Sequence, residues 1–294
     1  MLALPRIFVG MRDLGLLLKF RLAFSVVISA VAGYLLGAPE VHWTELILLT
    51  LGGFAVVGSS NAFNQVWEID QDGLMGRTQN RPLPSGRMTQ TRALVWAFAF
   101  GIAGIAALAL LNLKTAAFGA LSLLLYVLIY TPLKAKSPWA VLVGAIPGAI
   151  PFMLGWVAAT GSFGLEPGVL FAYQFVWQFP HFWAIAWLAY DDYAKAGYYL
   201  LPNRIKDRLA TRMTVFYALW MVLISLLPAF GLAGTLTTSL WASIATGVLG
   251  LDVMYHAVQH FRRADDASAR ALMFSTIRYL PLVQTLWVVD RFIQ

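Results

Sequence analysis

The stretch TELILLTLGGFAVVGSSNAFNQVWE, residues 44–68, decides the fold class. It is mostly apolar over 25 residues, and only Glu45 near its start and Glu68 at its end carry charge. About 20 such residues are enough for a helix to cross the hydrocarbon core of a bilayer. The stretch therefore predicts a membrane-spanning helix whose last turn carries an acidic side chain.

Working outward from this segment, eight further segments have a similar length and composition. Hydrophobic residues make up 60% of the 294 residues and charged residues only 12%, against about 25% charged residues in a soluble domain. We therefore predict an all-α, polytopic membrane helical bundle with nine transmembrane helices, forming a single domain over residues 1–294. The other eight segments span roughly 20–38, 92–112, 115–131, 138–160, 168–189, 212–232, 238–258 and 274–292.

The basic residues set the expected orientation. With the N-terminus in the cytoplasm, 19 of the 21 Lys and Arg residues lie on the cytoplasmic side, and only Lys114 and Arg291 do not. Positive charge in cytoplasmic loops is the usual topological signal. The net charge of +7 is explained in this way, and nucleic acid is not an expected partner because no basic stripe or binding motif accompanies the charge.

The N-terminal region carries Arg6, Arg12, Lys19 and Arg21 before the first apolar run. The run lacks a small-residue cleavage site, so we expect a first spanning helix and not a removed signal. No Arg- and Ser-rich transit segment precedes it, which favours a bacterial inner (plasma) membrane. The chain contains no cysteine, which excludes disulfides and thiolate metal sites.

A first polar cluster lies where the 44–68 segment ends. On a helical wheel at about 100° per residue, Asn64, Glu68 and Asp72 share one face with Asn61, whereas Asp70 lies opposite. Carboxylate and amide oxygens are hard ligands that suit Mg²⁺, which keeps other positions for water and phosphate oxygens. Charges at a helix end can also be merely solvated, but acidic residues beside a span predict a functional site.

Basic residues accompany this acidic face. Arg77 and Arg81 follow directly within DGLMGRTQNRPLPSGRM (72–88), and Lys134 and Lys136 lie in YTPLKAKSPW (130–139) at the same membrane face. Arginine binds phosphate oxygens in a fork geometry. The two lysines are either topological charges or, for Lys134, a further contact for phosphate.

A second polar region lies in FAYQFVWQFPHFWAIAWLAYDDYAKAGYYLLP, residues 171–202. Pro180 is expected to kink this helix. His181 is either a core histidine bonded to a neighbouring helix or a residue for substrate recognition or proton transfer. A further set of residues either lines a substrate channel or consists of ordinary packing or interfacial belt residues: Trp67, Trp177, Phe179, Phe182, Trp183 and Trp187. The polar stripe and the end of the helix comprise Gln174, Gln178, His181, Asp191 and Asp192, followed by Lys195.

Two acidic clusters with neighbouring bases on an apolar bundle favour one reaction type. Mg²⁺ would bridge carboxylates and the phosphate oxygens of a diphosphate ester with a long hydrocarbon tail. The metal and the bases would stabilise charge on the leaving diphosphate. An electron-rich acceptor would then attack the allylic cation. A transporter and a non-catalytic assembly factor are the alternatives from other classes.

The spacing Asn64-x3-Glu68-x3-Asp72 resembles the first motif of the UbiA superfamily of intramembrane prenyltransferases, Asn-x3-Asp-x3-Asp, with Glu in the middle position. Asp191 and Asp192 resemble a shortened form of its second motif. Within the superfamily, residues 72–88, 130–161 and 177–202 are most similar to the branch that farnesylates haem.

This resemblance implies transfer of a farnesyl group from farnesyl diphosphate to a vinyl group of haem B, giving haem O, within membrane lipid. It also implies contact with haem A synthase or a haem-copper oxidase assembly. A quinone precursor or another aromatic acceptor is the alternative. The expected catalytic residues are Asn64, Glu68, Asp72, Asp191 and Asp192; the expected Mg²⁺ ligands are Asn64, Glu68, Asp72 and Asp192; the expected substrate-binding residues are Arg77, Arg81, Lys134, Lys195, Gln178 and His181.

Overall fold

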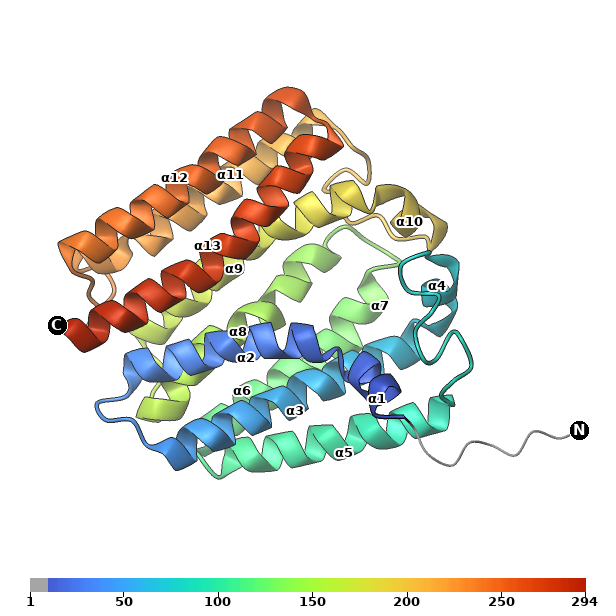
Figure 1. Ribbon diagram of the computed structural model, residues 1–294, viewed down its shortest axis with the longest axis horizontal. Coiled ribbons are helices and arrows are strands. Elements are labelled where there is room, and N and C mark those ends of the chain that lie inside the picture. Colours follow the sequence, from blue (N-terminus) through green and yellow to red (C-terminus); the bar gives the residue numbers. More distant parts are fainter. Residues whose placement is uncertain (1–9) are drawn as a thin grey trace, which may run out of the picture.

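The computed structural model describes residues 10–294, and every regular element within that range is a helix (Figure 1). Arg6, used above for the topology, lies outside the described residues. The short elements are α1 (Met11–Leu18), α4 (Ile69–Leu74), the π-helix η1 (Leu125–Tyr130), α7 (Thr131–Leu133), α10 (Tyr190–Lys195) and the 3-10 helix η2 (Leu227–Phe230). The long helices are α2 (Phe20–Gly37), α3 (Trp43–Trp67), α5 (Gln90–Ala109), α6 (Leu113–Leu124), α8 (Ala140–Thr160), α9 (Leu165–Leu188), α11 (Arg208–Ser225), α12 (Leu240–Arg263) and α13 (Asp266–Ile293).

The helices match the predicted segments. Seven of the predicted spans fall on single long helices, 212–232 falls on α11 and η2, and 115–131 falls on the continuous run α6–η1–α7. Six of the described helices are long and apolar enough to cross a membrane, namely α2, α3, α5, the α6–α7 run, α8 and α13. The helices α9, α11 and α12 are equally long but carry more polar residues. The prediction of an all-α, multi-pass membrane fold is confirmed.

Small residues allow the helices at the centre of the bundle to approach closely. A Cβ atom on Gly33 of α2 would clash with the backbone of α8 at Phe152, and one on Gly155 of α8 would clash with the backbone of α2 at Ala30. Close backbone approach through small residues is the usual way for helices to pack in a membrane. The α2–α8 pair therefore forms a tight contact, from which α3 and α5 extend to one side and α9, α11, α12 and α13 to the other (Figure 1).

Two helices break where the sequence analysis treated them as continuous. The helix α3 ends at Trp67, Glu68 leaves helical geometry with φ −106° and ψ 22°, and α4 begins at Ile69. Similarly, α9 ends at Leu188 and α10 begins at Tyr190. The helical wheels assumed continuous helices and were therefore wrong at these two breaks, although Asp72 stays buried one turn from Glu68.

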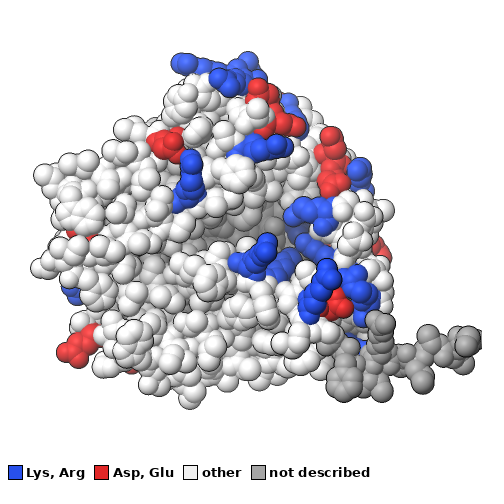
Figure 2. Space-filling view, viewed as in Figure 1, with Lys and Arg blue, Asp and Glu red and all other residues white. Residues whose placement is uncertain are grey.

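The two short helices α4 and α10 lie side by side at one end of the bundle (Figure 1). Figure 2 shows Lys and Arg gathered toward this end and around a hollowed part of the same face. The chain breaks thus bring the two acidic segments, 116 residues or more apart in sequence, to the same end of the molecule.

Candidate active site

The acidic face of α3 and α4 is withdrawn from solvent. The side chains of Asn64, Glu68 and Asp72 belong to residues that are only 1%, 3% and 1% exposed. Despite the break at Glu68, the backbone N–H of Asp72 donates to the carbonyl of Glu68 at 2.7 Å, which keeps the two acids one turn apart. Asp70 is exposed, as its position opposite this face predicts. Burying two carboxylates is costly unless each meets an opposite charge.

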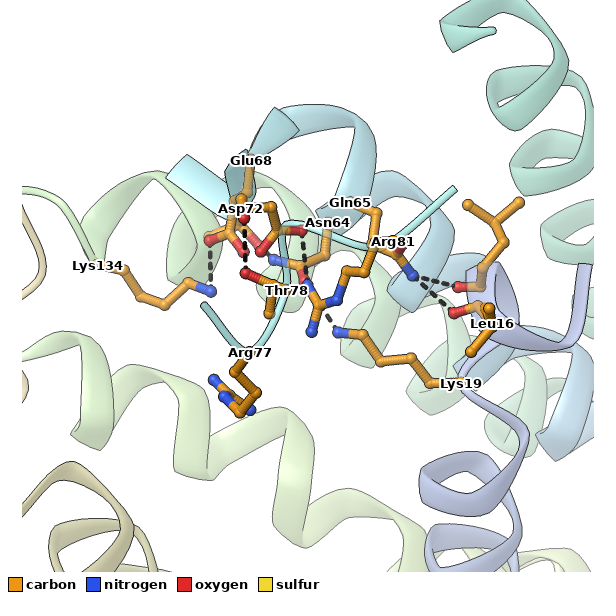
Figure 3. Close-up of polar contacts among 12 residues, drawn as sticks. Leu16, Lys19, Asn64, Gln65, Glu68, Asp72, Arg77, Thr78, Arg81 and Lys134 are labelled. Atoms are coloured by element: carbon orange, nitrogen blue, oxygen red, sulfur yellow. Dashed lines mark hydrogen bonds and ion pairs between the residues drawn. The ribbon is translucent and has the colours of Figure 1, made fainter. Parts of the chain in front are cut away.

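Three bases from different parts of the chain meet this face (Figure 3). Lys134, just after α7, forms an ion pair with Glu68. Arg81 lies 2.6 Å from Oδ2 of Asp72, and Lys19 donates to Oδ1 of Asn64 at 3.2 Å. The result is a buried cluster of alternating charge, which we call the paired-charge cluster: Lys19, Asn64, Glu68, Asp72, Arg81 and Lys134.

The sequence analysis did not single out Lys19, which counted only as a topological charge. It lies at the junction of α1 and α2 in left-handed geometry, with φ 50°. The amide of Gln65 donates to the carbonyls of Leu16 and Leu17 at 3.0 and 2.7 Å, and that of Asn61 donates to the carbonyl of Leu18 at 3.2 Å. Asn61 thus fixes the end of α1 and does not add a ligand to the acidic face.

Lys19 lies just outside the spanning helix α2, and its environment makes its ammonium group easier to deprotonate. Withdrawal from water, followed by the positive charges of Arg81 and Lys134, lowers the pKa of Lys19 to about 7. An ammonium group ordinarily keeps its proton well above neutral pH. A base placed at the start of the first span was the only sequence signal that could have revealed this residue.

The π-helix η1 positions a further part of the cluster. Thr131 follows η1, and its backbone N–H and its hydroxyl both donate to the carbonyl of Tyr126. Asn64 in turn donates to the Thr131 hydroxyl at 3.3 Å. Short π-helices are frequent at functional sites. The same region holds Lys134, whose ammonium group lies 5.1 Å from the ring centre of Tyr130 and 5.4 Å from that of Tyr198.

The second acidic segment has a different environment. The two carboxylate oxygens of Asp192 accept the backbone N–H groups of Gly76 and Arg77 at 3.3 and 3.4 Å, and Lys195 donates at 3.3 Å. Partial desolvation raises the pKa of Asp192, but these hydrogen bonds outweigh it and hold the pKa below its usual range. Asp191 is exposed, and its side chain has no polar partner among residues 10–294. Asp192 therefore ties α10 to the loop after α4.

Other predicted substrate-binding residues lie apart from the cluster. Gln178 is buried and donates to the carbonyls of Ala145 and Gln174, so it links α9 to α8. Lys195 is exposed beside Asp192, and Arg77 points toward the Tyr193 hydroxyl at 3.5 Å. Within the described residues, none of these three side chains forms a polar contact with the acids of α3 and α4. Their roles stay predictions.

The aromatic residues of the sequence analysis fall into a buried group and an exposed group. Phe179, Trp183 and Trp187 are buried in a core cluster between α9 and α11, which is ordinary packing. Trp67 and Phe182 are exposed. A channel role for this set is thus limited to the members that are not buried, where it stays a prediction.

The oxygen atoms of the cluster suit a hard cation. Oδ1 of Asp72 is buried and has no hydrogen-bond partner, because Arg81 contacts only Oδ2. Glu68 lies one turn away. In residues 10–294, no group of three or more His, Asp and Glu side chains is close enough to hold a metal ion. The protein alone thus offers two carboxylates and an amide, and phosphate oxygens would have to complete the coordination of a Mg²⁺ ion.

The sequence profile of the UbiA prenyltransferase family matches residues 26–278. The chain belongs to this family. Two relatives that bear the name protoheme IX farnesyltransferase are 50% and 47% identical to this UbiA family member. They come from Christiangramia forsetii, with 94% of this chain and 92% of the relative covered, and from Flavobacterium johnsoniae, with 100% and 98% covered.

Solved structures show the same fold for this UbiA family member. A digeranylgeranylglyceryl phosphate synthase superposes with a TM-score of 0.80 at 17% identity, over 97% of this chain and 99% of the other. A UbiA homologue from Archaeoglobus fulgidus, bound to GPP and Mg²⁺, superposes with a TM-score of 0.71 at 15% identity, over 96% and 98%.

Proposed function

We propose that this protein transfers the farnesyl group of farnesyl diphosphate to a vinyl group of haem B, giving haem O. The buried paired-charge cluster at the end of an apolar bundle carries this proposal. The names of relatives 47–50% identical over nearly the whole chain support haem as the acceptor. The GPP and Mg²⁺ bound to the Archaeoglobus fulgidus homologue support a prenyl diphosphate and a divalent cation.

The reaction makes one carbon–carbon bond and breaks one carbon–oxygen bond. The C1–O bond of farnesyl diphosphate ionises, and the pair of electrons leaves with the diphosphate. The vinyl π electrons attack C1, and the resulting carbocation next to the porphyrin ring captures water and loses a proton. The products are haem O, diphosphate and H⁺, so the reaction needs no oxidant or reductant.

The residues of the cluster have complementary tasks in this scheme. Asn64, Glu68 and Asp72 would hold Mg²⁺, which neutralises charge on the diphosphate. Arg81 and Lys134, now paired with Asp72 and Glu68, would turn to the phosphate oxygens once the cation occupies the carboxylates. Fixed positive charge near a leaving group that gains negative charge is an effective form of catalysis.

The second acidic segment would act on the same substrate from the other loop. Asp192 holds the backbone of Gly76 and Arg77, and thereby the loop from which Arg77 and Arg81 extend. We propose that Asp191 and Asp192 approach the diphosphate or its metal when substrate is present. Arg77 and Lys195 would then bind phosphate, and Gln178 would contact the acceptor.

We further propose a single catalytic domain with nine spans and a cytoplasmic N-terminus in a bacterial inner membrane. The coincidence of nine segments with long helices supports the number of spans. The Lys and Arg at the end that holds α4 and α10 support a cytoplasmic active site (Figure 2). Transfer of haem O to haem A synthase or an oxidase assembly stays a prediction.

The test is a reconstitution with defined substrates. Purified full-length protein is incubated with haem B, farnesyl diphosphate and Mg²⁺, and the porphyrin product is identified by mass. We expect a product with the mass of hydroxyethylfarnesyl haem, lost on addition of a chelator and restored by excess Mg²⁺. Farnesylation of a quinone precursor without any haem product would contradict the proposal. Parallel reactions with geranylgeranyl diphosphate test the chain length.

A further inference from the structure

The imidazole of His181 is held rigidly on α9. Its Nδ1 lies 3.0 Å from the hydroxyl of Thr276 on α13. The ring of Trp177, one turn earlier on α9, stacks on the imidazole with centroids 4.7 Å apart and an interplanar angle of 16°. The indole N–H of Trp177 donates to the backbone carbonyl of the same Thr276 at 2.9 Å. Two contacts to one residue of α13 therefore fix the orientation of the ring.

The hydroxyl of Thr276 determines which ring nitrogen of His181 carries hydrogen. A hydroxyl has one hydrogen to donate, and the Thr276 oxygen lies only 2.7 Å from the carbonyl of Met273. A carbonyl can only accept, so the hydroxyl hydrogen lies on that shorter contact. The Thr276 oxygen then accepts from Nδ1–H of His181. In the neutral imidazole, Nε2 is left with a free lone pair.

This arrangement is the one used by histidines that bind metals. A metal-ligating histidine donates its other ring N–H to an oxygen atom of the protein, which fixes the tautomer and the direction of the lone pair. Nε2 of His181 has no polar partner among residues 10–294, and the residue is partly exposed. The proposed acceptor, haem B, brings an iron atom whose usual protein ligand is a histidine.

His260 makes the comparison informative. Its Nδ1 lies 3.1 Å from the hydroxyl of Ser268, which donates to the carbonyl of Asp265 at 2.9 Å, so its tautomer is set in the same way. However, His260 is only 2% exposed and packs against Trp187 with the ring planes nearly perpendicular, at 85°, so it offers almost no surface to a ligand. Nε2 of His256 lies 3.6 Å from a carboxylate oxygen of Asp252. His181 thus combines a fixed tautomer with partial exposure and an Nε2 that has no polar partner among residues 10–294.

We infer that Nε2 of His181 ligates the iron of haem B during the reaction, and that Thr276 is a positioning residue which fixes its tautomer. This inference rests on the proposed function. Seven residues separate His181 from Leu188 at the end of α9, which is about 10 Å of helix. Ligation at this depth places the porphyrin inside the apolar bundle, with the acidic end of the bundle beyond it. The ligand would select which edge of the porphyrin faces the diphosphate.

The test uses ferric haem B as the probe, added to the full-length protein in nanodiscs. The wild type is expected to give the absorption and electron paramagnetic resonance spectra of histidine-ligated haem. His181→Gly should lose them and regain them on addition of free imidazole, whereas the matched variant His260→Gln should keep them. Thr276→Val should weaken haem binding by about tenfold or more, and Thr276→Ser should restore it. Unchanged binding of farnesyl diphosphate reports that each variant is folded.

The outcomes separate this inference from the proposed function. Identical haem spectra in the wild type and in folded His181→Gly would overturn the ligation by His181. If the wild type farnesylates haem B with no histidine signature, the ligation fails and the proposed function stands. If His181 ligates haem but only another acceptor is prenylated, the proposed function fails and the ligation stands as a binding property.

Discussion

The two acidic segments look alike in sequence but differ in their surroundings. On α3 and α4, Glu68 and Asp72 are buried; Glu68 pairs with Lys134 from a distant segment, and Asp72 pairs with Arg81 of the loop that follows α4. On α10, Asp191 is exposed, and Asp192 is partly exposed and bound to backbone N–H groups of the neighbouring loop. The first segment holds its charged groups away from water, where electrostatic interactions are strong. The second segment connects α10 to the loop after α4. The two segments carry similar acidic residues, and the position of the surrounding bases determines which segment forms a buried charged site and which holds a loop.

The strongest test of this difference is loss of the buried carboxylate with its shape retained. Asp72→Asn removes the partner of Arg81 and the oxygen that has no hydrogen-bond partner. We expect farnesyl transfer to fall by about a hundredfold or more, since fixed charges near developing charge contribute on this scale. Turnover of haem B by the purified variant provides the measurement.

Asp70→Asn is the matched control, because Asp70 lies on the same short helix but is exposed. Its activity should stay within about twofold of the wild type, as is usual for surface changes away from a site. A folded Asp72→Asn protein with near-normal turnover would show that the buried pair is structural, and would favour a non-catalytic role for the protein.

The fold could be predicted from sequence because it depends on local composition. Apolar length gave the nine helical segments, and the positions of Lys and Arg gave an expected orientation. The candidate site was predicted only in part. Asn64, Glu68 and Asp72 were recognisable from spacing within one segment, whereas the break at Glu68 and the pairing with Lys134 depend on tertiary contacts. Lys19 was missed because its role depends on Asn61 and Gln65, which hold the end of α1 from another helix.

A weaker test concerns the loop connection made by Asp192. Asp192→Asn keeps one oxygen that can accept a backbone N–H but loses the charge that draws Lys195. If Asp192 acts mainly by holding the loop of Arg77, KM for farnesyl diphosphate should rise by roughly tenfold while kcat changes less. Steady-state kinetics with varied farnesyl diphosphate separates the two constants.

Asp191→Asn on the same helix removes an exposed carboxylate that does not bind the loop of Arg77. It should therefore raise KM for farnesyl diphosphate less than Asp192→Asn does, and a loss of kcat would report its proposed approach to the diphosphate. A loss of kcat in Asp192→Asn as large as that in Asp72→Asn would reverse the comparison. It would place Asp192 among the groups that stabilise the leaving diphosphate, as the resemblance to the shortened second motif implies.

The smallest expected effect concerns Lys19, whose pKa of about 7 makes the cluster sensitive to pH. Protonated Lys19 attracts the diphosphate, so binding is strongest below pH 7 and weakens as the pH rises and the proton is lost. At pH 8 only about one tenth of the lysine in the free protein keeps its proton, so the affinity should fall by up to about tenfold.

Lys19→Arg retains its charge over this range and should show a flatter profile, with binding at pH 6 within about twofold of the wild type. The dissociation constant of farnesyl diphosphate is measured from pH 6 to pH 8.5 at fixed Mg²⁺, so that the titration of the substrate is common to all variants. Lys136→Arg, at an exposed position, should keep the slope of the wild type. Equal slopes for the wild type and Lys19→Arg would mean that Lys19 does not change its charge in this range, and that its part in the cluster is limited to the hydrogen bond to Asn64.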